Sequence, residues 1–123
     1  MSDYNSHLTL QVIPADNKQH YQVVRFSGEL DKAGLNLIKD QIEKLVDNFS
    51  LKYLVFDFAD LHFINSECIG FLMAIYAHLV KAEKKLVVVQ APANIMDIFK
   101  VIGLSQVIDT YDSLPTFLEK NPL

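Results

Sequence analysis

Two short apolar runs, separated by a segment of helical length, restrict what this chain can fold into more than any other feature. Residues 53–58 and 85–90 are rich in valine, leucine and aromatic residues and have the length of strands buried on both faces. Residues 33–49, 66–81 and 92–102 predict three helices. Strands joined through helices pair in parallel with right-handed crossovers. The sequence therefore predicts an α/β fold around a mixed, mostly parallel sheet.

Shorter elements complete this prediction. They are strands over 7–13, 21–26 and 106–109 and a helix over 113–120. Pro14, Asp16 and Asn17 mark a turn between the first two strands, which we expect to form an antiparallel hairpin. The predicted order is β-β-α-β-α-β-α-β-α, with about five strands and about four helices. We expect residues 1–123 to form one domain, in which residues 1–6 and 121–123 are flexible.

Composition excludes several classes of function. The formal net charge is −4 and the 11 Lys and Arg residues are scattered, which argues against nucleic-acid binding. Cys68 is the single cysteine, so no internal disulfide forms. The longest apolar run, residues 68–77, is too short to span a bilayer, and no signal peptide is visible. We expect a cytoplasmic protein without membrane insertion, cofactor or metal.

The segment from Asp57 to Gly70 carries the most information about function. It is predicted to be a loop that leaves the carboxyl end of a buried strand and enters the helix 66–81, the edge at which α/β sheets bind ligands and partners. Asn65 or Ser66 can cap that helix, as Asp31 can cap the helix 33–49. A phosphate on Ser66 would lie beside free amides and the positive helix end. Ser66 is therefore either a cap alone or a phosphate acceptor.

The helix 66–81 is apolar almost all round, which indicates burial or a partner. At 100° per residue, its predicted core face holds Ile69, Leu72, Met73, Tyr76 and Val80. The opposite face holds Glu67, Phe71, Ala74 and His78. Phe71, flanked by Ile75, is then either an exposed apolar patch beside Ser66 and a candidate interface, or is covered by a neighbouring helix or loop.

Two enzyme-like readings compete with a binding module. A helix N-terminus lowers a thiol pKa, so Cys68 is a candidate nucleophile, although a small buried cysteine fits better. Asp57 and Asp60 near a strand end resemble the magnesium site of response regulators, but the acidic pair expected after the first strand is missing. His62 and His78 are isolated from such groups. We therefore expect no enzymatic activity and no catalytic residue.

Three segments in order resemble the motifs of one family, the STAS-domain anti-sigma factor antagonists. They are Phe26–Asp31 (FSGELD), Leu61–Gly70 (LHFINSECIG) and Ile98–Leu104 (IFKVIGL). The resemblance covers nearly the whole chain. It implies a STAS-like single domain and regulation of transcription by partner switching.

The resemblance also implies partners and a modified residue. Members bind an anti-sigma factor, which is a serine kinase of the histidine-kinase-like ATPase type, and so free a sigma factor. Phosphorylation of the serine that Ser66 matches breaks the complex, and a serine phosphatase restores it. We expect a monomer or weak homodimer. The residues predicted to bind the partner are Asp31, Asn65, Ser66, Glu67, Phe71, Ala74 and His78.

Three departures from the family pattern affect this site. Asn65 stands where the family has Asp, which keeps a capping oxygen but removes a charge. Glu67 replaces a second hydroxyl residue, and Cys68 replaces Gly. These changes leave open an alternative, in which the protein is a non-phosphorylated scaffold or a regulatory subunit of another signalling or transport complex.

Overall fold

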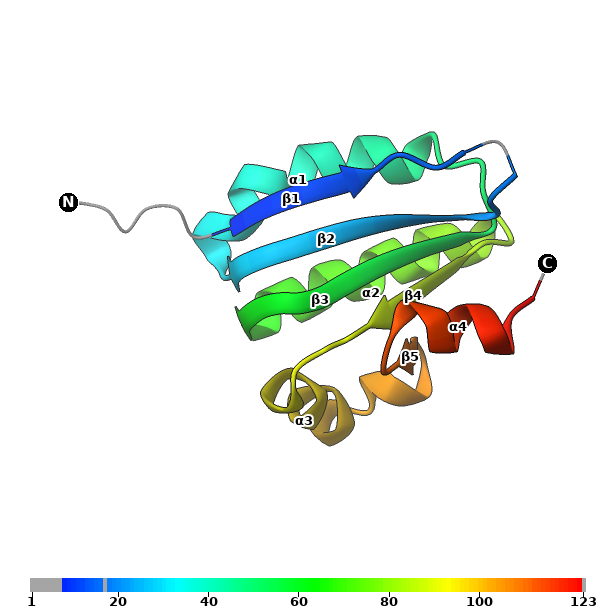
Figure 1. Cartoon of the computed structure of the whole chain (residues 1–123). Helices are drawn as coiled ribbons and strands as arrows, with labels where there is room; N and C mark the ends of the chain where they lie inside the picture. Colours follow the sequence, from blue (N-terminus) through cyan, green and yellow to red (C-terminus); the bar gives the residue numbers. More distant parts are fainter. Residues whose placement is uncertain (1–7, 17, 123) are drawn as a thin grey trace.

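A five-stranded mixed sheet forms the centre of the protein (Figure 1). The structure, a computed structural model, describes residues 8–16 and 18–122. The elements are β1 (Leu8–Ile13), β2 (Tyr21–Leu30), α1 (Lys32–Asp47), β3 (Tyr53–Ile64), α2 (Ser66–Lys81), β4 (Lys85–Val89), α3 (Ala93–Ile102), the 3-10 turn η1 (Leu104–Gln106), β5 (Asp109–Tyr111) and α4 (Leu114–Lys120). The strands lie in the order β1-β2-β3-β4-β5; β1 and β2 are antiparallel and the other pairs parallel. The predicted α/β fold is confirmed.

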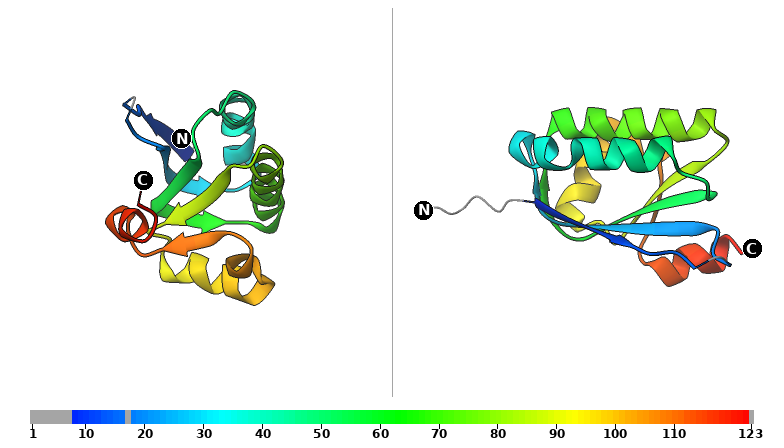
Figure 2. Two further views of the ribbon diagram at one scale, coloured as in Figure 1. Left: turned by 90° about the vertical axis from the view of Figure 1, so that its right-hand side faces the viewer. Right: turned by 90° about the horizontal axis from the view of Figure 1, so that it is seen from above.

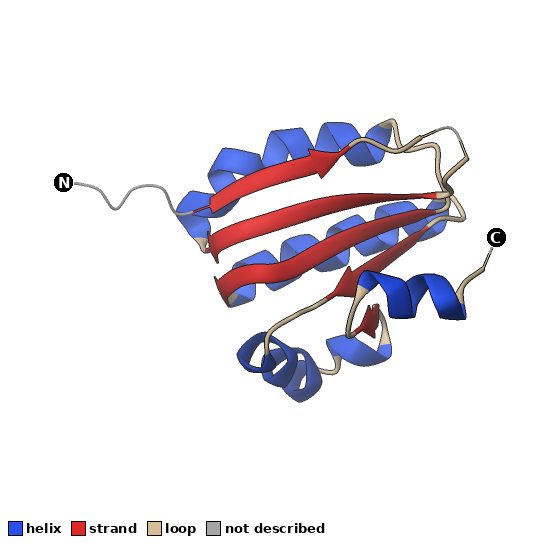
Figure 3. Ribbon diagram, viewed as in Figure 1, coloured by secondary structure: helices blue, strands red, loops and turns tan. Residues whose placement is uncertain are grey.

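The two faces of the sheet are covered unequally. Figure 2 shows α1 and α2 on one face and α4 on the other, and Figure 3 shows how short α4 is beside them. Side chains of β3 alternate between the two cores: Leu54 and Phe56 join α1 and α2, whereas Val55 joins a smaller cluster with Phe117 of α4. One face of the sheet is therefore covered by α1 and α2, and α4 covers only one end of the other face.

Several predicted boundaries agree with the structure. Residues 66–81 are helical as predicted, and the hairpin of β1 and β2 is present. Its turn is held by the Asp16 carboxylate, which accepts hydrogen bonds from the amides of Lys18 and Gln19 at 2.8 and 3.0 Å. His7 and residues 1–6, like Leu123, lie outside the described residues. The flexibility expected for residues 121–123 stays a prediction, although the Asn121 amide donates to the Phe117 carbonyl.

Other boundaries differ. The strand predicted over 106–109 is wrong in position, because the chain forms a 3-10 turn after Gly103 and β5 begins only at Asp109. Gly103 adopts the left-handed conformation, with φ 79°, that ends α3. Pro92 precedes α3 as its N-cap instead of lying in its first turn.

The largest correction concerns β2 and β3, which both run further than predicted. β2 continues to Leu30, and β3 continues to Ile64 through the segment predicted to be a loop. β3 holds one extra residue against β2 at each of two places, opposite Arg25–Ser27 and opposite Gly28–Glu29. Such bulges break the alternation by which a strand is recognised, yet they keep the two strands paired to their ends.

The start of α1 packs closely against the end of β2. A Cβ atom added at Gly34 would lie 2.5 Å from the carbonyl oxygen of Glu29 and 3.1 Å from the Leu8 Cβ. Gly34 is buried in the first turn of α1, so this close approach requires a residue without a side chain. Gly70, in α2, has no atom within 4 Å of such a Cβ.

We therefore predict opposite effects for two glycine substitutions. Gly34→Ala should lower the free energy of unfolding by about 1–3 kcal/mol, because the new methyl group forces α1 away from the sheet. Gly70→Ala should raise it by up to about 1 kcal/mol, because alanine is a better helix former. Urea unfolding followed by circular dichroism measures both. Equal stability of the two variants would contradict the packing described for Gly34.

Candidate partner-docking site

The ends of β2 and β3 bring two helix starts together. Leu30 pairs with Ile64 at the end of the ladder, and each strand passes at once into a cap residue and a 16-residue helix. The Asn65 amide donates to the Leu30 carbonyl at 3.1 Å, so the two chain segments remain paired at the corner. Lys32 and Ser66 occupy equivalent first positions of α1 and α2. We name the four residues Asp31, Asn65, Ser66 and Glu67 the α1–α2 corner.

Both predicted caps are present. The Asp31 carboxylate accepts a hydrogen bond from the Gly34 amide at 2.8 Å, and the Asn65 side-chain oxygen accepts one from the Cys68 amide at 2.9 Å. The cap of α2 is therefore Asn65, and the reading of Ser66 as only a cap is wrong. Asp31 and Asn65 are half-buried, as their capping roles require.

Ser66 is the first residue of α2 and is exposed. The amides of a first helical turn have no acceptor within the helix, and the positive end of the helix dipole lies there. A phosphate on Ser66 can therefore be accommodated without unfolding the helix. Glu67, also exposed, places a negative charge next to the same hydroxyl, whereas Lys32 places a positive charge at the neighbouring helix start.

Cys68 is not the nucleophile considered above. Its side chain is fully buried and its thiol donates to the Asp31 carbonyl at 3.5 Å. Burial, reinforced by the negative charge of Glu67, raises the pKa of Cys68 to about 11. The thiol is therefore protonated at neutral pH and shielded from reagents. It fills the space between the first turns of α1 and α2.

Of the two alternatives for Phe71, the exposed apolar patch is wrong. Phe71 is only 9% exposed, and Ile75 is also buried, because α1 lies beside α2 and covers that face. Val80, assigned to the core face, is instead 46% exposed. The alternative, that a neighbouring helix covers Phe71, is the one found.

Ala74 and His78 lie apart from the corner. Both are exposed and line a groove of about 300 Å³ between α1 and α2, with Phe71 at its side. The His78 Nε2 atom lies 3.4 Å from the Asp47 carboxylate of α1. Twelve residues separate Ser66 from His78, or about 18 Å along the helix. The structure thus divides the predicted partner-binding residues into two sets, and partner binding by either set stays a prediction.

The magnesium-site reading of Asp57 and Asp60 also fails. Asp57 lies inside β3, where its carboxylate accepts hydrogen bonds from the Arg25 Nε at 3.3 Å and from the Ala59 amide at 2.9 Å. Asp60 is exposed further along the strand. Among the residues that the structure describes, no group of three His, Cys, Asp or Glu residues is arranged to hold a metal ion.

Phe63 is a surface residue that the sequence reasoning missed. It lies near the end of β3, opposite Glu29, and is 46% exposed three residues before Ser66. Aromatic side chains exposed beside a polar site are typical of interfaces. The available signal was a large aromatic residue in the segment 57–70, but its orientation depends on the second bulge, which no sequence pattern shows.

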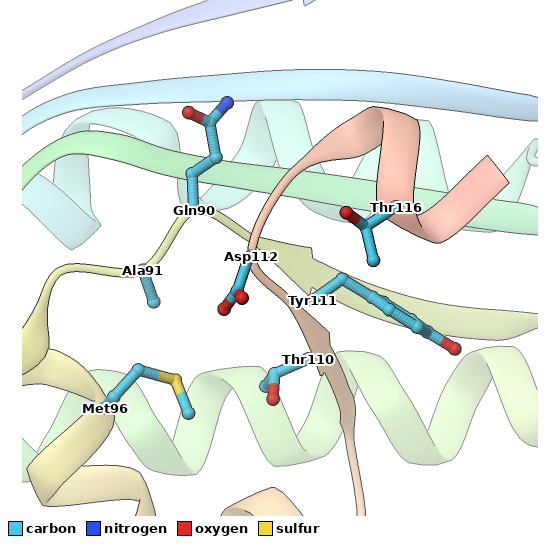
Figure 4. A pocket seen from close by; sticks show the side chains of 7 residues that line it. All are labelled: Gln90, Ala91, Met96, Thr110, Tyr111, Asp112 and Thr116. Carbon is cyan, nitrogen blue, oxygen red and sulfur yellow. The ribbon is translucent and has the colours of Figure 1, made fainter. Parts of the chain in front are cut away.

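A second hollow opens at the carboxyl ends of β4 and β5. It has a volume of about 430 Å³, and Figure 4 shows the Asp112 carboxylate directed toward the space between Ala91, Met96 and Thr110. Its described lining residues include no Lys, Arg, His or Cys. This hollow therefore offers no cation for an anionic ligand, and the α1–α2 corner remains the stronger candidate site.

The identity of the α2 cap gives a stability prediction. Asn65→Ala should lower the free energy of unfolding by about 1 kcal/mol, because the Cys68 amide loses its acceptor. Ser66→Ala should change it by less than about 0.5 kcal/mol, because the exposed hydroxyl does not cap the helix. Chemical denaturation of the two variants against wild type checks this. A larger loss for Ser66→Ala than for Asn65→Ala would reassign the cap.

The raised pKa of Cys68 gives a pH prediction. Between the ordinary thiol value of 9.0 and the folded value of about 11, the unfolded chain loses the proton while the folded chain keeps it. The Cys68 contribution to stability is therefore full below pH 9 and lost as pH rises toward 11. Urea unfolding at pH 8 to 11 should show a steeper decline for wild type than for Cys68→Ala. Parallel declines would mean that the thiol titrates normally.

Comparison with known proteins agrees with the fold. The family model for the STAS domain matches residues 13–117. An anti-sigma factor antagonist from Mycobacterium paratuberculosis is 28% identical, with 98% of this chain and 97% of that chain covered and a TM-score of 0.79. The Bacillus cell fate determinant SpoIIAA in its phosphorylated form is 16% identical, with 91% and 98% covered and a TM-score of 0.68.

SpoIIAA in its unphosphorylated form is also 16% identical, with 94% of this chain and 98% of that chain covered and a TM-score of 0.75. At this identity the likeness to SpoIIAA concerns the fold. Among the described residues, no helix combines the length and apolarity that a bilayer crossing needs. Because the family model covers most of its length, the chain belongs to the STAS domain family.

Proposed function

We propose that this protein is an anti-sigma factor antagonist, which binds an anti-sigma factor of the serine kinase type and thereby releases a sigma factor. The observation that carries the proposal is the exposed Ser66 hydroxyl at the first position of α2, left unused by the cap because Asn65 supplies it. The relative from Mycobacterium paratuberculosis, which is an anti-sigma factor antagonist, supports this role at 28% identity over almost the whole chain.

In this proposal, the α1–α2 corner is the docking surface. Asp31 and Asn65 are held by their capping hydrogen bonds, so a partner meets a rigid surface there and loses little conformational entropy on binding. Ser66 and Glu67 follow the cap residue Asn65 directly and are exposed to solvent. Phe63 extends the surface with an aromatic side chain. Ala74 and His78 border a groove further along α2 and would contact only a partner large enough to follow that helix.

Phosphorylation of Ser66 by the partner kinase then reverses binding. The phosphate adds a charge of about −1.5 to −2. It can be stabilised within this chain by the first-turn amides of α2, so the domain stays folded while the docking surface becomes more negative. Glu67 lies on the same surface, and the two negative charges would together repel an acidic partner segment. A serine phosphatase would restore the binding form.

The residues that differ from the family pattern make the proposed switch depend on one hydroxyl. Glu67 replaces a second hydroxyl residue, so Ser66 is the single acceptor in this turn. Asn65 caps without a charge and therefore does not repel a neighbouring phosphate. The proposal places the protein in the cytoplasm, where the kinase has ATP.

A second candidate function is a scaffold that is never phosphorylated. The exposed Glu67 favours it, because a permanent negative charge next to Ser66 partly reproduces what a phosphate would add. Such a scaffold would bind its partner through the same corner, in a signalling or transport complex other than a sigma-factor system. The two candidates differ in whether a charge at Ser66 changes binding.

Capture of partners from the native cell tests the proposal. Wild type and Ser66→Ala should both retain an anti-sigma factor kinase, whereas Ser66→Asp should lose at least nine-tenths of it because the added charge lies in the docking surface. Ser50→Asp is the matched control, since Ser50 is exposed in the loop before β3, at the opposite end of that strand. It should bind like wild type.

Two outcomes would contradict the switch. Equal recovery of the partner by wild type, Ser66→Ala and Ser66→Asp would favour the constitutive scaffold. Loss of the partner by Ser50→Asp as well would mean that net charge, and not the α1–α2 corner, controls binding. Incubation of the recovered kinase with ATP should phosphorylate wild type but not Ser66→Ala, which mass spectrometry measures.

A further inference from the structure

The sheet face opposite α1 and α2 holds an ion pair that the proposed function does not use. Asp57 of β3 is only 4% exposed and lies opposite Val89 of β4, a member of the smaller apolar cluster on this face. Its partner is Arg25 of the neighbouring strand β2. Burying the Asp57 charge costs roughly what its attraction to Arg25 returns, so this ion pair is weak evidence of a stabilising role. This pair therefore calls for another explanation.

A cavity lies directly against the pair. Its volume is about 190 Å³, and Arg25 and Asp57 are the charged groups among its described lining residues. Much of the remaining wall is apolar, with Ile13, Val23 and Val89 from the sheet and Leu114 from the first turn of α4. A cavity of about 150 Å³ is sufficient to bind benzene. The space thus fits one aromatic ring or a branched aliphatic group of similar size.

The hydrogen bonds of the pair engage both carboxylate oxygens of Asp57 but leave most N–H donors of Arg25 free to bind. Asp57 uses one carboxylate oxygen for the Arg25 Nε, at 3.3 Å, and the other for the Ala59 amide, at 2.9 Å. Arg25 has five N–H donors, of which Nε is occupied and one Nη1 donor makes only a long contact of 3.4 Å to Gln11 at the surface. Its side chain is 40% exposed. Asp57 therefore orients a guanidinium whose outer donors remain available.

We propose that this cavity binds a small carboxylate with an aromatic or branched aliphatic body. The carboxylate accepts hydrogen bonds from the outer nitrogens of Arg25, a geometry that a guanidinium matches in a bidentate way. The apolar body lies against Val23, Val89 and Leu114. Asp57 acts as a positioning residue, because its carboxylate holds Arg25 through Nε. The site is independent of the proposed docking function.

Titration of the ¹⁵N-labelled protein with three compounds of similar size tests the proposal. Benzoate should shift the amide resonances of Val89 and Leu114 in a saturable way while leaving those of Ser66 and Glu67 unchanged. Benzyl alcohol should bind at least tenfold more weakly, because it lacks the charge that Arg25 recognises. Benzylamine should bind no better than benzyl alcohol. Equal binding of benzoate and benzyl alcohol, or tightest binding of benzylamine, would overturn the assignment.

Variants separate recognition by Arg25 from general effects. Arg25→Lys keeps the positive charge and should weaken benzoate binding at least tenfold through loss of the forked geometry. The double variant Arg25→Gln with Asp57→Asn leaves no unpaired buried charge, so it should stay folded and bind benzoate only as weakly as benzyl alcohol. Lys100→Gln on α3 removes one positive charge elsewhere and should bind benzoate like wild type.

A blocking variant tests the cavity itself. Leu114→Trp fills the space from the α4 side and should abolish the shifts caused by both benzoate and benzyl alcohol, while the circular dichroism melting curve shows that the protein is folded. Unchanged benzoate binding in Leu114→Trp or in the double variant would falsify the proposal.

Discussion

The pairing of β2 with β3 up to their last residues is the constraint on which the rest of the structure depends. Because Leu30 and Ile64 end the ladder side by side, α1 and α2 must start side by side, and the Asn65 amide bonds to the Leu30 carbonyl across that junction. The two helices then run together along one face of the sheet. This packing buries Phe71 between them and leaves Ser66 and Glu67, the first two residues of α2, at the surface.

Much of the fold could be predicted because local patterns and tertiary structure agree. The spacing in residues 33–49 predicts a helix, and the apolar run 53–58 predicts a buried strand. Each of these elements has one stable position in an α/β fold. The cap of α2 could be narrowed only to Asn65 or Ser66, since both carry an acceptor oxygen at a suitable position. The structure decides for Asn65 through the hydrogen bond to the Cys68 amide.

The remaining errors have physical causes. The extension of β3 to Ile64 passes through two bulges, each of which adds a residue and shifts the alternation of side chains. The pattern of residues 57–64 therefore resembles a loop, although its backbone is paired with β2. For α2, apolar residues cover nearly the whole circumference, so helical spacing alone could not decide whether Phe71 or Val80 faces the core. Only the position of α1 decides it.

Because the two faces of the sheet are covered unequally, they carry different polar groups. On the helical side, polar groups occur at the strand ends, where caps satisfy them and Ser66 stays accessible. On the other side, α4 is too short to cover the sheet, and β3 carries Asp57 in a position that water reaches poorly. An aspartate there requires a counter-charge, and Arg25 supplies it from the neighbouring strand. The Arg25 guanidinium also extends toward solvent. The group that neutralises Asp57 is therefore also a partly free anion receptor on an otherwise apolar face.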